Sequence, residues 1–507
     1  MADNVWFGNA SWPSNRSCGE FAKDVFRIAG AKTDKQKALA FYDWFTRCMM
    51  RGPNLFVPTA GGGYTRSYDP LSVFTSWGFG ECTDWGWVAT EALCAAGVKA
   101  RRVVVHNMGH TYYEIWYKGD DGKEQWHAFD PFGGWFFMNR SGEVASCEEL
   151  AADPQLAQNP LPGHPVPLGH HPDRANLAHR HRTEDQLFID QPIRDDKNNW
   201  SLLPGMEVTM TFIPETPSQA LFAGKKQDDG TVIRPQGGHC DMTPLSKLGF
   251  LQHKQHLPYW ENYLLPSQEI SHMNEGRPVR WHGCGALRWK PLQQGAGVAE
   301  LVKNAVFENG VLRPKGTHDF AEVWYHFKLP FLATFIQVDY DVAGGGGDYF
   351  GICLSADGRR SLWPMPMKKN GPGYGVTSNG QADWRAGRAS VQGLKEFWLR
   401  IDMTTHQARP SLAVQGFDVT VGFQHNMFIQ PRLVPGQNAL WLERGSGADN
   451  DALTAEWIYQ LNGDERRETL SLAKGSRAEK TVSIDASSPA DVKMTGMKLR
   501  CESGSQR

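Results

Sequence analysis

Two patterns of hydrophobic and polar positions divide this chain. Between Phe21 and Met50 apolar residues recur at helical spacing, which predicts a helix-rich segment. From about Val298 onward, short segments alternate or stay apolar between Pro and Gly turn signals, among them AEVWYHFKLP, FLATFIQVDYDV and KEFWLRIDM. Strands at such spacing are typical of a β-sandwich. We therefore expect an α+β domain followed by all-β domains.

Changes in composition place the boundaries of four regions. We predict an α+β domain over 1–190, a mainly β intermediate region over 191–297, a β-sandwich over 298–449 and a small C-terminal β segment over 450–507. Residues 159–182 hold five prolines and five histidines, which predicts a loop. Imidazole is a common ligand for zinc or copper. No helix or hairpin fixes these side chains, so metal binding by His164, His170, His171, His179 and His181 stays open.

A cysteine stands where a helix is expected to begin. The segment GFGEC predicts a tight turn, and the apolar residues after it predict a helix from Cys82 that ends at Gly97. At a helix N-terminus, unpaired N–H groups and the helix dipole favour a thiolate over a thiol. The thiolate is the attacking species, and the same N–H groups suit the negative oxygen of an attacked carbonyl. Cys82 is therefore the candidate nucleophile.

Two later strands supply a histidine and an aspartate. The strand HTYYEIWY begins at His110, and the strand EQWHAFD ends at Asp130 because Pro131 cannot continue the ladder. In antiparallel neighbours joined by a tight loop, the start of one strand lies near the end of the next. Asp130 then fixes the tautomer of His110, which takes or returns the proton of Cys82.

Each of these residues also has a purely structural interpretation. A free cysteine is commonly a small core hydrophobe, and an isolated histidine or aspartate carries no more weight. Two other histidines are weaker candidates than His110. His106 ends the preceding strand, and His127 lies on the opposite strand face from Asp130.

The order of these motifs resembles a known family. The helix-initial Cys82, the strand-initial His110 and Asp130 before proline, with AAGVKARRV between them, resemble the catalytic core of the transglutaminase-like superfamily over roughly Lys35 to Trp135. The resemblance implies an α+β transglutaminase-like catalytic domain with a papain-like triad, here followed by all-β (β-sandwich) accessory domains. The run from CTDWGWVATEALCAAGVKARRV to HAFDP is also similar to peptide:N-glycanase, which frees glycans from asparagine, although this chain lacks the paired CxxC zinc motifs of that enzyme.

Aromatic residues are abundant, with 19 tryptophans and 13 tyrosines. Sugar rings and peptides pack on flat apolar surfaces, while core packing is the ordinary role of such side chains. Five aromatic residues near the triad are candidate substrate-binding residues: Trp77, Trp85, Tyr112, Tyr113 and Trp135. The β-sandwich is a candidate carbohydrate-binding domain by likeness of architecture alone.

Charge and composition remove several function classes. The net charge of −2 comes without a basic block, so we expect no nucleic-acid partner. No apolar run reaches membrane-spanning length, and we expect no membrane partner.

The N-terminus lacks a hydrophobic secretory region; a secreted or periplasmic location stays open if a leader was removed. The nine cysteines show no CxxC spacing, which argues against a structural zinc site and a dense disulfide framework. The oligomeric state stays open.

Three hypotheses remain. The first is a thiol-dependent hydrolase that attacks an amide through Cys82 without a cofactor or metal, on a peptide or glycopeptide. The second is a carbohydrate-active enzyme in the same cleft, which releases glycans or cleaves a polysaccharide by β-elimination with His110 and Tyr112 or Tyr113. The third is a catalytically idle glycan-binding protein.

Overall fold

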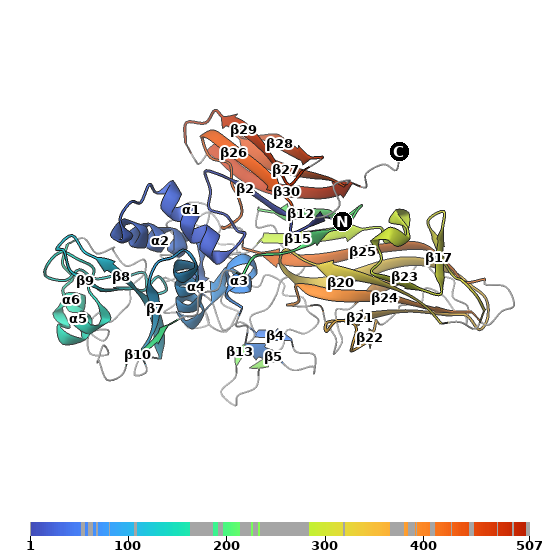
Figure 1. The fold of residues 1–507 in the computed structure, drawn as a ribbon, viewed down its shortest axis with the longest axis horizontal. Helices are drawn as coiled ribbons and strands as arrows, with labels where there is room; N and C mark the ends of the chain where they lie inside the picture. Colours follow the sequence, from blue (N-terminus) through green and yellow to red (C-terminus); the bar gives the residue numbers. More distant parts are fainter. Residues whose placement is uncertain are drawn as a thin grey trace.

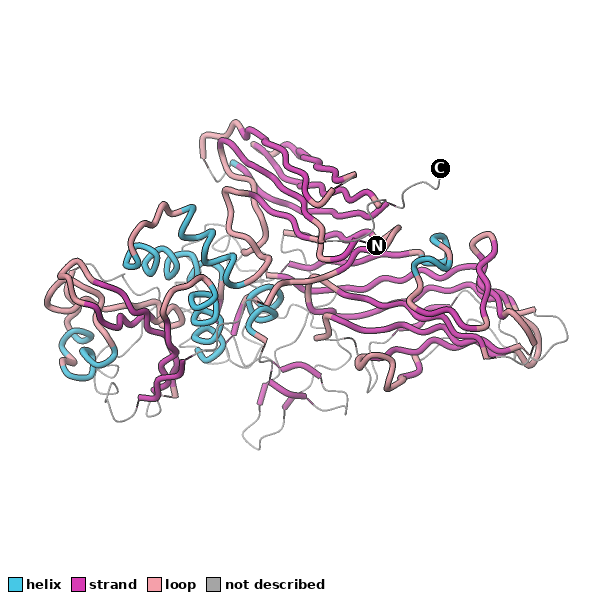
Figure 2. The backbone as a smooth tube through the Cα atoms, in the orientation of Figure 1, coloured by secondary structure: helices cyan, strands magenta, loops and turns pink. Residues whose placement is uncertain are grey.

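The structure is a computed structural model, in which the protein is mostly β (Figure 1). Figure 2 shows the α-helices gathered toward one side and long strands filling the rest. The described residues are 2–51, 56–58, 64–66, 69–80, 82–105, 109–162, 186–190, 196–212, 225–226, 232–233, 283–317, 320–365, 380–383, 391, 393–405, 411–426, 428–445, 451–473, 475–488 and 491–502. We call the elements from α1 to β10 the α+β part.

Several helices are capped by their own sequence. Ser17 accepts the N–H of Glu20 before α1 (Cys18–Ile28), and capping boxes precede α2 (Asp34–Cys48) and α5 (Cys147–Ala152). The helix-rich segment Phe21–Met50 thus holds α1 and α2, which are separated at Gly30, where φ is +64°. Further helical segments are α3 (Pro70–Ser72), the π-helical η1 (Val73–Trp77), α4 (Cys82–Ala95), α6 (Gln155–Gln158), η8 (Pro291–Gln294) and η9 (Ala296–Val298).

A four-stranded antiparallel sheet lies at the centre of the α+β part. Its strand order is β10 (Gln186–Asp190), β7 (Ala100–Val105), β8 (His110–Lys118) and β9 (Glu124–Phe129). One face packs on α2 and α4, where Tyr113 contacts Phe41, and α1 packs on these two helices. The other face packs on α5 and α6, where Tyr112 contacts Cys147. Neighbouring residues of β8 therefore lie in two separate cores, as the two-residue period of a strand requires.

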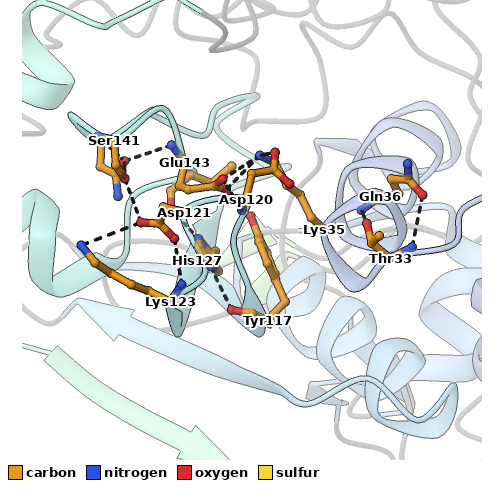
Figure 3. A network of polar contacts seen from close by, with 12 residues as sticks. Thr33, Lys35, Gln36, Tyr117, Asp120, Asp121, Lys123, His127, Ser141 and Glu143 are labelled. Carbon is orange, nitrogen blue, oxygen red and sulfur yellow. Dashed lines mark hydrogen bonds and ion pairs between the residues drawn. The ribbon is translucent and has the colours of Figure 1, made fainter.

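Charged contacts tie the β8–β9 hairpin to the start of α2 (Figure 3). Lys35 Nζ lies 2.6 Å from Asp120 Oδ2 and 2.9 Å from Glu143 Oε1, and Glu143 accepts the N–H of Asp120 at 2.6 Å. A Cβ on Gly119 would lie 2.9 Å from the Glu143 carboxyl carbon. The hairpin therefore comes this close to the carboxylate because residue 119 is glycine.

Two large antiparallel sheets make up most of the remaining described chain. The first has the order β17 (Ala305–Glu308), β18 (Val311–Pro314), β25 (Ala413–His425), β15 (Gly283–Trp289), β12 (Glu207–Thr211), β30 (Val492–Glu502), β27 (Ala452–Leu461) and β28 (Asp464–Leu472), while β20 (Leu332–Ala343) pairs with β25 and β23 (Gly380–Asp383). The second has the order β16 (Leu301–Lys303), β19 (Ala321–Lys328), β24 (Glu396–Thr404), β21 (Tyr349–Ser355) and β22 (Trp363–Pro364).

These two sheets pack face to face. Aromatic contacts join them, with ring centroids 5.1 Å apart for Trp289 and Tyr325 and 5.2 Å apart for Tyr340 and Phe350. All four side chains belong to one continuous hydrophobic core, as in aligned sheet packing. The β-rich character that the alternation from about Val298 predicted is confirmed.

Strand pairing crosses the region boundaries expected from composition. β15 pairs with β25 and β12 pairs with β30, so the sheet continues past residues 298 and 450. β2 (Trp6–Asn9) pairs with β26 (Gly436–Glu443), whose other neighbour is β29 (Arg477–Ile484). Short pairs are β1 (Ala2–Asp3) with β11 (Ser201–Leu202), β3 (Met50–Arg51) with β6 (Phe79–Gly80), β4 (Phe56–Pro58) with β5 (Tyr64–Arg66), and β13 (Lys225–Lys226) with β14 (Val232–Ile233). Composition does not encode such long-range registers.

A buried asparagine of the β region holds the segment that leads into α4. Asn426 is fully buried, and its Nδ2 donates to the carbonyls of Cys48 at 2.8 Å and Phe74 at 2.9 Å. Its backbone N–H donates to Thr75 at 2.7 Å. η1 ends at Gly78, where φ is +65° and a Cβ would lie 2.7 Å from Asn426 Cγ. The segment that leads toward Cys82 is thus held by the residue that follows β25, far away in sequence.

Candidate active site

Cys82 is the first residue of α4, as predicted, and it is half-buried. Its Sγ lies 4.0 Å from the carbonyl oxygen of Gly109, the residue before β8. Just before the helix, a Cβ on Gly80 would lie 2.8 Å from Asp84 Cβ, so the incoming chain lies directly against the first turn of α4. The backbone N–H groups of that first turn have no partner within the helix.

His110 is the first residue of β8, and its side chain is 13% exposed. Its Nε2 lies 2.6 Å from Asp130 Oδ2, a length typical of a strong, charge-assisted hydrogen bond. Because Nε2 is engaged by Asp130, Nδ1 is the ring nitrogen that remains for Cys82. The predicted meeting of a strand start and a strand end is therefore present.

Charges around His110 favour its protonated form. Burial alone would lower the pKa of His110, but the charge of Asp130 and hydrogen bonds to Asp130 and Cys82, with the charge of Cys82, raise that pKa from 6.5 to about 10. At neutral pH the imidazole is thus an imidazolium held between a carboxylate and a sulfur. Such a group has a proton to give to a leaving amine.

Asp130 is fully buried at the end of β9 and holds a turn together. Its Oδ1 accepts the N–H of Gly133 at 2.7 Å, and its backbone forms a two-way bridge with Trp135, 2.9 Å in each direction. A Cβ on Gly133 would lie 2.4 Å from Asp130 Oδ2, which leaves room only for glycine. The Asp130 carboxylate therefore holds both the His110 ring and the turn that follows Asp130.

Close packing of α4 on β8 sets the separation of the cysteine and the histidine. A Cβ on Gly86 would lie 2.9 Å from Thr111 Cγ2. One turn earlier, the Oγ1 atoms of Thr83 and Thr111 lie 3.4 Å apart. Thr83 and Thr111 directly follow Cys82 and His110 in the sequence. Contact between these neighbours therefore brings the two reactive side chains together.

The five aromatic residues expected to bind substrate are buried in the cores. Trp77, Trp85, Tyr112 and Tyr113 are 0% exposed and Trp135 is 1% exposed. They belong to the two hydrophobic cores and offer no ring surface to a cleft. The expectation of aromatic walls made by these residues is corrected accordingly, because residue type alone does not distinguish a core ring from an exposed one.

Neither Tyr112 nor Tyr113, which follow His110 in β8, is positioned to donate a proton to a substrate. The Tyr112 hydroxyl lies 2.7 Å from Cys147 Sγ in the core beneath α5. Tyr113 faces the opposite core and stacks on Phe129 at 5.9 Å. Burial is the largest cause that raises the pKa of both phenols well above the usual value.

One of the two weaker histidine candidates, His127, lies in a core of the protein. His127 is fully buried, its Nδ1 lies 2.5 Å from the carbonyl oxygen of Val144, and its ring stacks on Tyr117 at 3.5 Å (Figure 3). Burial lowers the pKa of His127, as expected for a structural imidazole. His106 and the histidine-rich residues 164–181 lie outside the described residues.

Three residues beside the triad escaped sequence reasoning: Gly86, Phe132 and Gly133. Phe132 is half-buried, and its ring centroid lies 5.9 Å from that of His110 and 5.8 Å from that of Trp85. Two sequence signals could have identified them. Gly86 is an isolated glycine inside a helical pattern, which often marks close packing. The segment DPFGGW, which begins at Asp130, places Phe132 and Gly133 in a turn directly after the strand.

The described ranges contain no group of three or more His, Cys, Asp or Glu side chains arranged to hold a metal ion. Across the same part of the chain, no helix combines the length and apolar character needed to cross a bilayer. Compared with known proteins, the chain matches no protein-family model, and no curated protein matches its sequence significantly.

Proposed function

We propose that this protein is a thiol-dependent enzyme of transglutaminase-like type that cleaves or transfers an amide-type bond. One observation carries the proposal: His110 lies between Asp130 Oδ2, at 2.6 Å, and the helix-initial Cys82. Nucleophile, base and orienting carboxylate in contact are the parts that acyl transfer requires. The resemblance of residues 35–135 to the transglutaminase-like core supports the same chemistry.

In the first half of the reaction, the Cys82 thiolate attacks the carbonyl carbon of the amide and a C–S bond forms. The carbonyl oxygen becomes negative and lies within reach of the N–H groups in the first turn of α4. The C–N bond then breaks, and the leaving nitrogen takes the proton of the His110 imidazolium. An amine departs, and a thioester on Cys82 remains.

In the second half, the neutral His110 takes a proton from a water molecule, whose oxygen attacks the thioester carbon. The C–S bond breaks, which releases a carboxylic acid and restores the Cys82 thiolate with the imidazolium. An amine in place of water gives a new amide, so the same residues serve transfer. Asp130 keeps the imidazole in one orientation throughout.

The burial of both tyrosines favours this thiol mechanism over β-elimination. An elimination needs an acid that reaches the leaving oxygen of the sugar, yet the Tyr112 hydroxyl contacts Cys147 inside the core and Tyr113 packs beneath α2. Release of a glycan from an asparagine side chain is itself amide cleavage, so it requires only the triad. A peptide or a glycopeptide is therefore the proposed substrate class.

Mass spectrometry of products tests the proposal. Wild-type protein is incubated with peptides, N-glycopeptides and acidic polysaccharides, alongside Cys82→Ala and His110→Ala. Amide cleavage or glycan release that both variants abolish supports the thiol mechanism. An unsaturated sugar product, or full activity in Cys82→Ala with loss in His110→Ala, rejects it.

A second candidate function, glycan binding by the region 298–449, is favoured by one surface. On the outer face of β19, β21 and β24, Phe320 is 42% and Tyr349 is 51% exposed, and Trp398 stacks on His326 at 4.3 Å. Arg400 pairs there with Glu322 and Asp402. Exposed rings beside paired charges suit a neutral sugar. Isothermal titration with neutral oligosaccharides tests this, and Tyr349→Ala is expected to weaken any binding.

A further inference from the structure

The histidine of the triad is held by groups on several sides. It begins β8, its Nε2 is hydrogen-bonded to Asp130, and a further hydrogen bond joins the ring to Cys82. Two rings limit rotation of the imidazole, Tyr112 at a centroid distance of 6.0 Å and Phe132 at 5.9 Å, with interplanar angles of 41° and 49°. Tyr112 is fully buried in the core, where close packing keeps its ring in place. Phe132 is half-buried, so it forms the outer side of this enclosure.

Phe132 also contacts the helix that carries the cysteine. Its ring meets Trp85 of α4 edge to face, at 5.8 Å and 87°, and Trp85 is fully buried. Trp85 lies one helical turn from Cys82. A single side chain thus touches His110 and the helix of Cys82.

The turn that presents Phe132 is itself rigid. Asp130 accepts the N–H of Gly133 and bridges to Trp135 on both sides, and a Cβ on Gly133 has no room. Pro131 restricts the backbone just before Phe132. The carboxylate that binds His110 therefore also positions the Phe132 ring beside it.

We infer that Phe132 is a positioning residue that holds the His110 ring toward Cys82 and keeps water away from the His110–Asp130 pair. The inference rests on the proposed function for its catalytic meaning, but its physical content is the contact between imidazole and sulfur. When Phe132 is truncated, the ring can turn away from Sγ and water can screen the pair. The contact between the imidazole and Sγ of Cys82 is then made less often.

The test follows alkylation of Cys82 by iodoacetamide between pH 5 and 9, with peptide-resolved mass spectrometry. Iodoacetamide reacts with the thiolate, so no substrate is needed. We expect Phe132→Ala to slow alkylation of Cys82 at pH 6 by about tenfold. Phe132→Leu, which keeps most of the volume, is expected to stay within about threefold of wild type.

Phe188→Ala is the matched control, because Phe188 is a half-buried ring of the same sheet that packs on Arg101, away from the triad. It should leave the Cys82 profile unchanged. If Phe132→Ala does not fold, Phe132→Val takes its place. A wild-type profile in the truncated variant overturns the inference. Absence of amide cleavage by wild type instead rejects the proposed function and leaves the alkylation result readable.

Discussion

The two ends of α4 each carry a half-buried cysteine, and their surroundings differ. Cys82 lies in the first turn, beside His110 and the carbonyl of Gly109. Cys94 lies in the last turn, where its Sγ is 3.5 Å from the carbonyl oxygen of Ala100 and burial raises its pKa. Similar exposure thus accompanies different neighbours: an imidazole beside Cys82 and a backbone carbonyl beside Cys94. If Cys82 reacts as proposed, the helix end and the neighbouring histidine, rather than access, set it apart from Cys94.

The largest expected difference between the ends is in catalysis. Cys82→Ala removes the nucleophile and should lower turnover of a cleavable amide by about 10⁴-fold or more. Cys94→Ala should stay within about twofold of wild type, since it touches no reacting group. Product formation by liquid chromatography measures both. Equal loss in the two variants would mean that α4 matters as structure alone.

The His110–Asp130 pair beside the Cys82 end of α4 should make stability depend on pH. The pKa of His110 is raised from 6.5 to about 10 in the folded protein, so its protonation contributes stability that is full below about pH 6.5 and is lost as pH rises toward 10. The slope is at most about 1.4 kcal/mol per pH unit. Hydrogen-exchange protection of the β8 amides, corrected for intrinsic rates, measures it. Asp130→Asn should flatten this slope, and an unchanged slope would contradict the ion pair.

A smaller effect is expected in thiol reactivity. At pH 6 to 7, iodoacetamide should alkylate Cys82 about tenfold faster than Cys94 in the same molecule. His110→Ala should remove most of this ratio, while leaving Cys94 as it was. Peptide mass spectrometry reports both sites at once. A ratio near one in wild-type protein would show that the histidine does not stabilise the Cys82 thiolate.

The smallest effect concerns one glycine within α4 and one just beyond its end. Gly86→Ala places a Cβ 2.9 Å from Thr111 Cγ2 and should cost about 1–3 kcal/mol, with roughly threefold slower alkylation of Cys82 as the helix moves away. Gly97→Ala meets no neighbour within 4 Å but has φ of +86°, so it should cost about 1–2 kcal/mol. Its Cys82 reactivity should not change. Urea unfolding measures the loss of stability in each variant, and the alkylation assay measures the change in Cys82 reactivity.

Local sequence signals were sufficient for the residues of the candidate site. Cys82 begins α4, His110 begins β8 and Asp130 directly follows β9, and each of these positions follows from a glycine, a proline or a change of period within the same stretch. The hairpin between the two strands then brings His110 and Asp130 together without long-range information. Such contacts are local, and residue patterns encode them well.

Long-range packing was beyond the reach of the same reasoning. The pairing of β12 with β30, and the burial of Trp77 and Trp135 rather than their display in a cleft, depend on which surfaces meet in three dimensions. The contact of Gly86 with Thr111 is a matter of fractions of an ångström. Alternation predicts that a strand exists but leaves its partner unspecified.

The pairing of β2 with β26 has a consequence for the time course of synthesis. Asn9 Nδ2 donates to Asn438 Oδ1 across 429 residues, so the earlier strand has no partner until the later one has been made. At about 5–20 residues per second, the wait is roughly 20 to 90 seconds. All four residues of β2 are buried in the finished fold. During that interval the Trp6 and Phe7 side chains and both edges of β2 are exposed. Exposed apolar side chains and unpaired strand edges are features that chaperones bind.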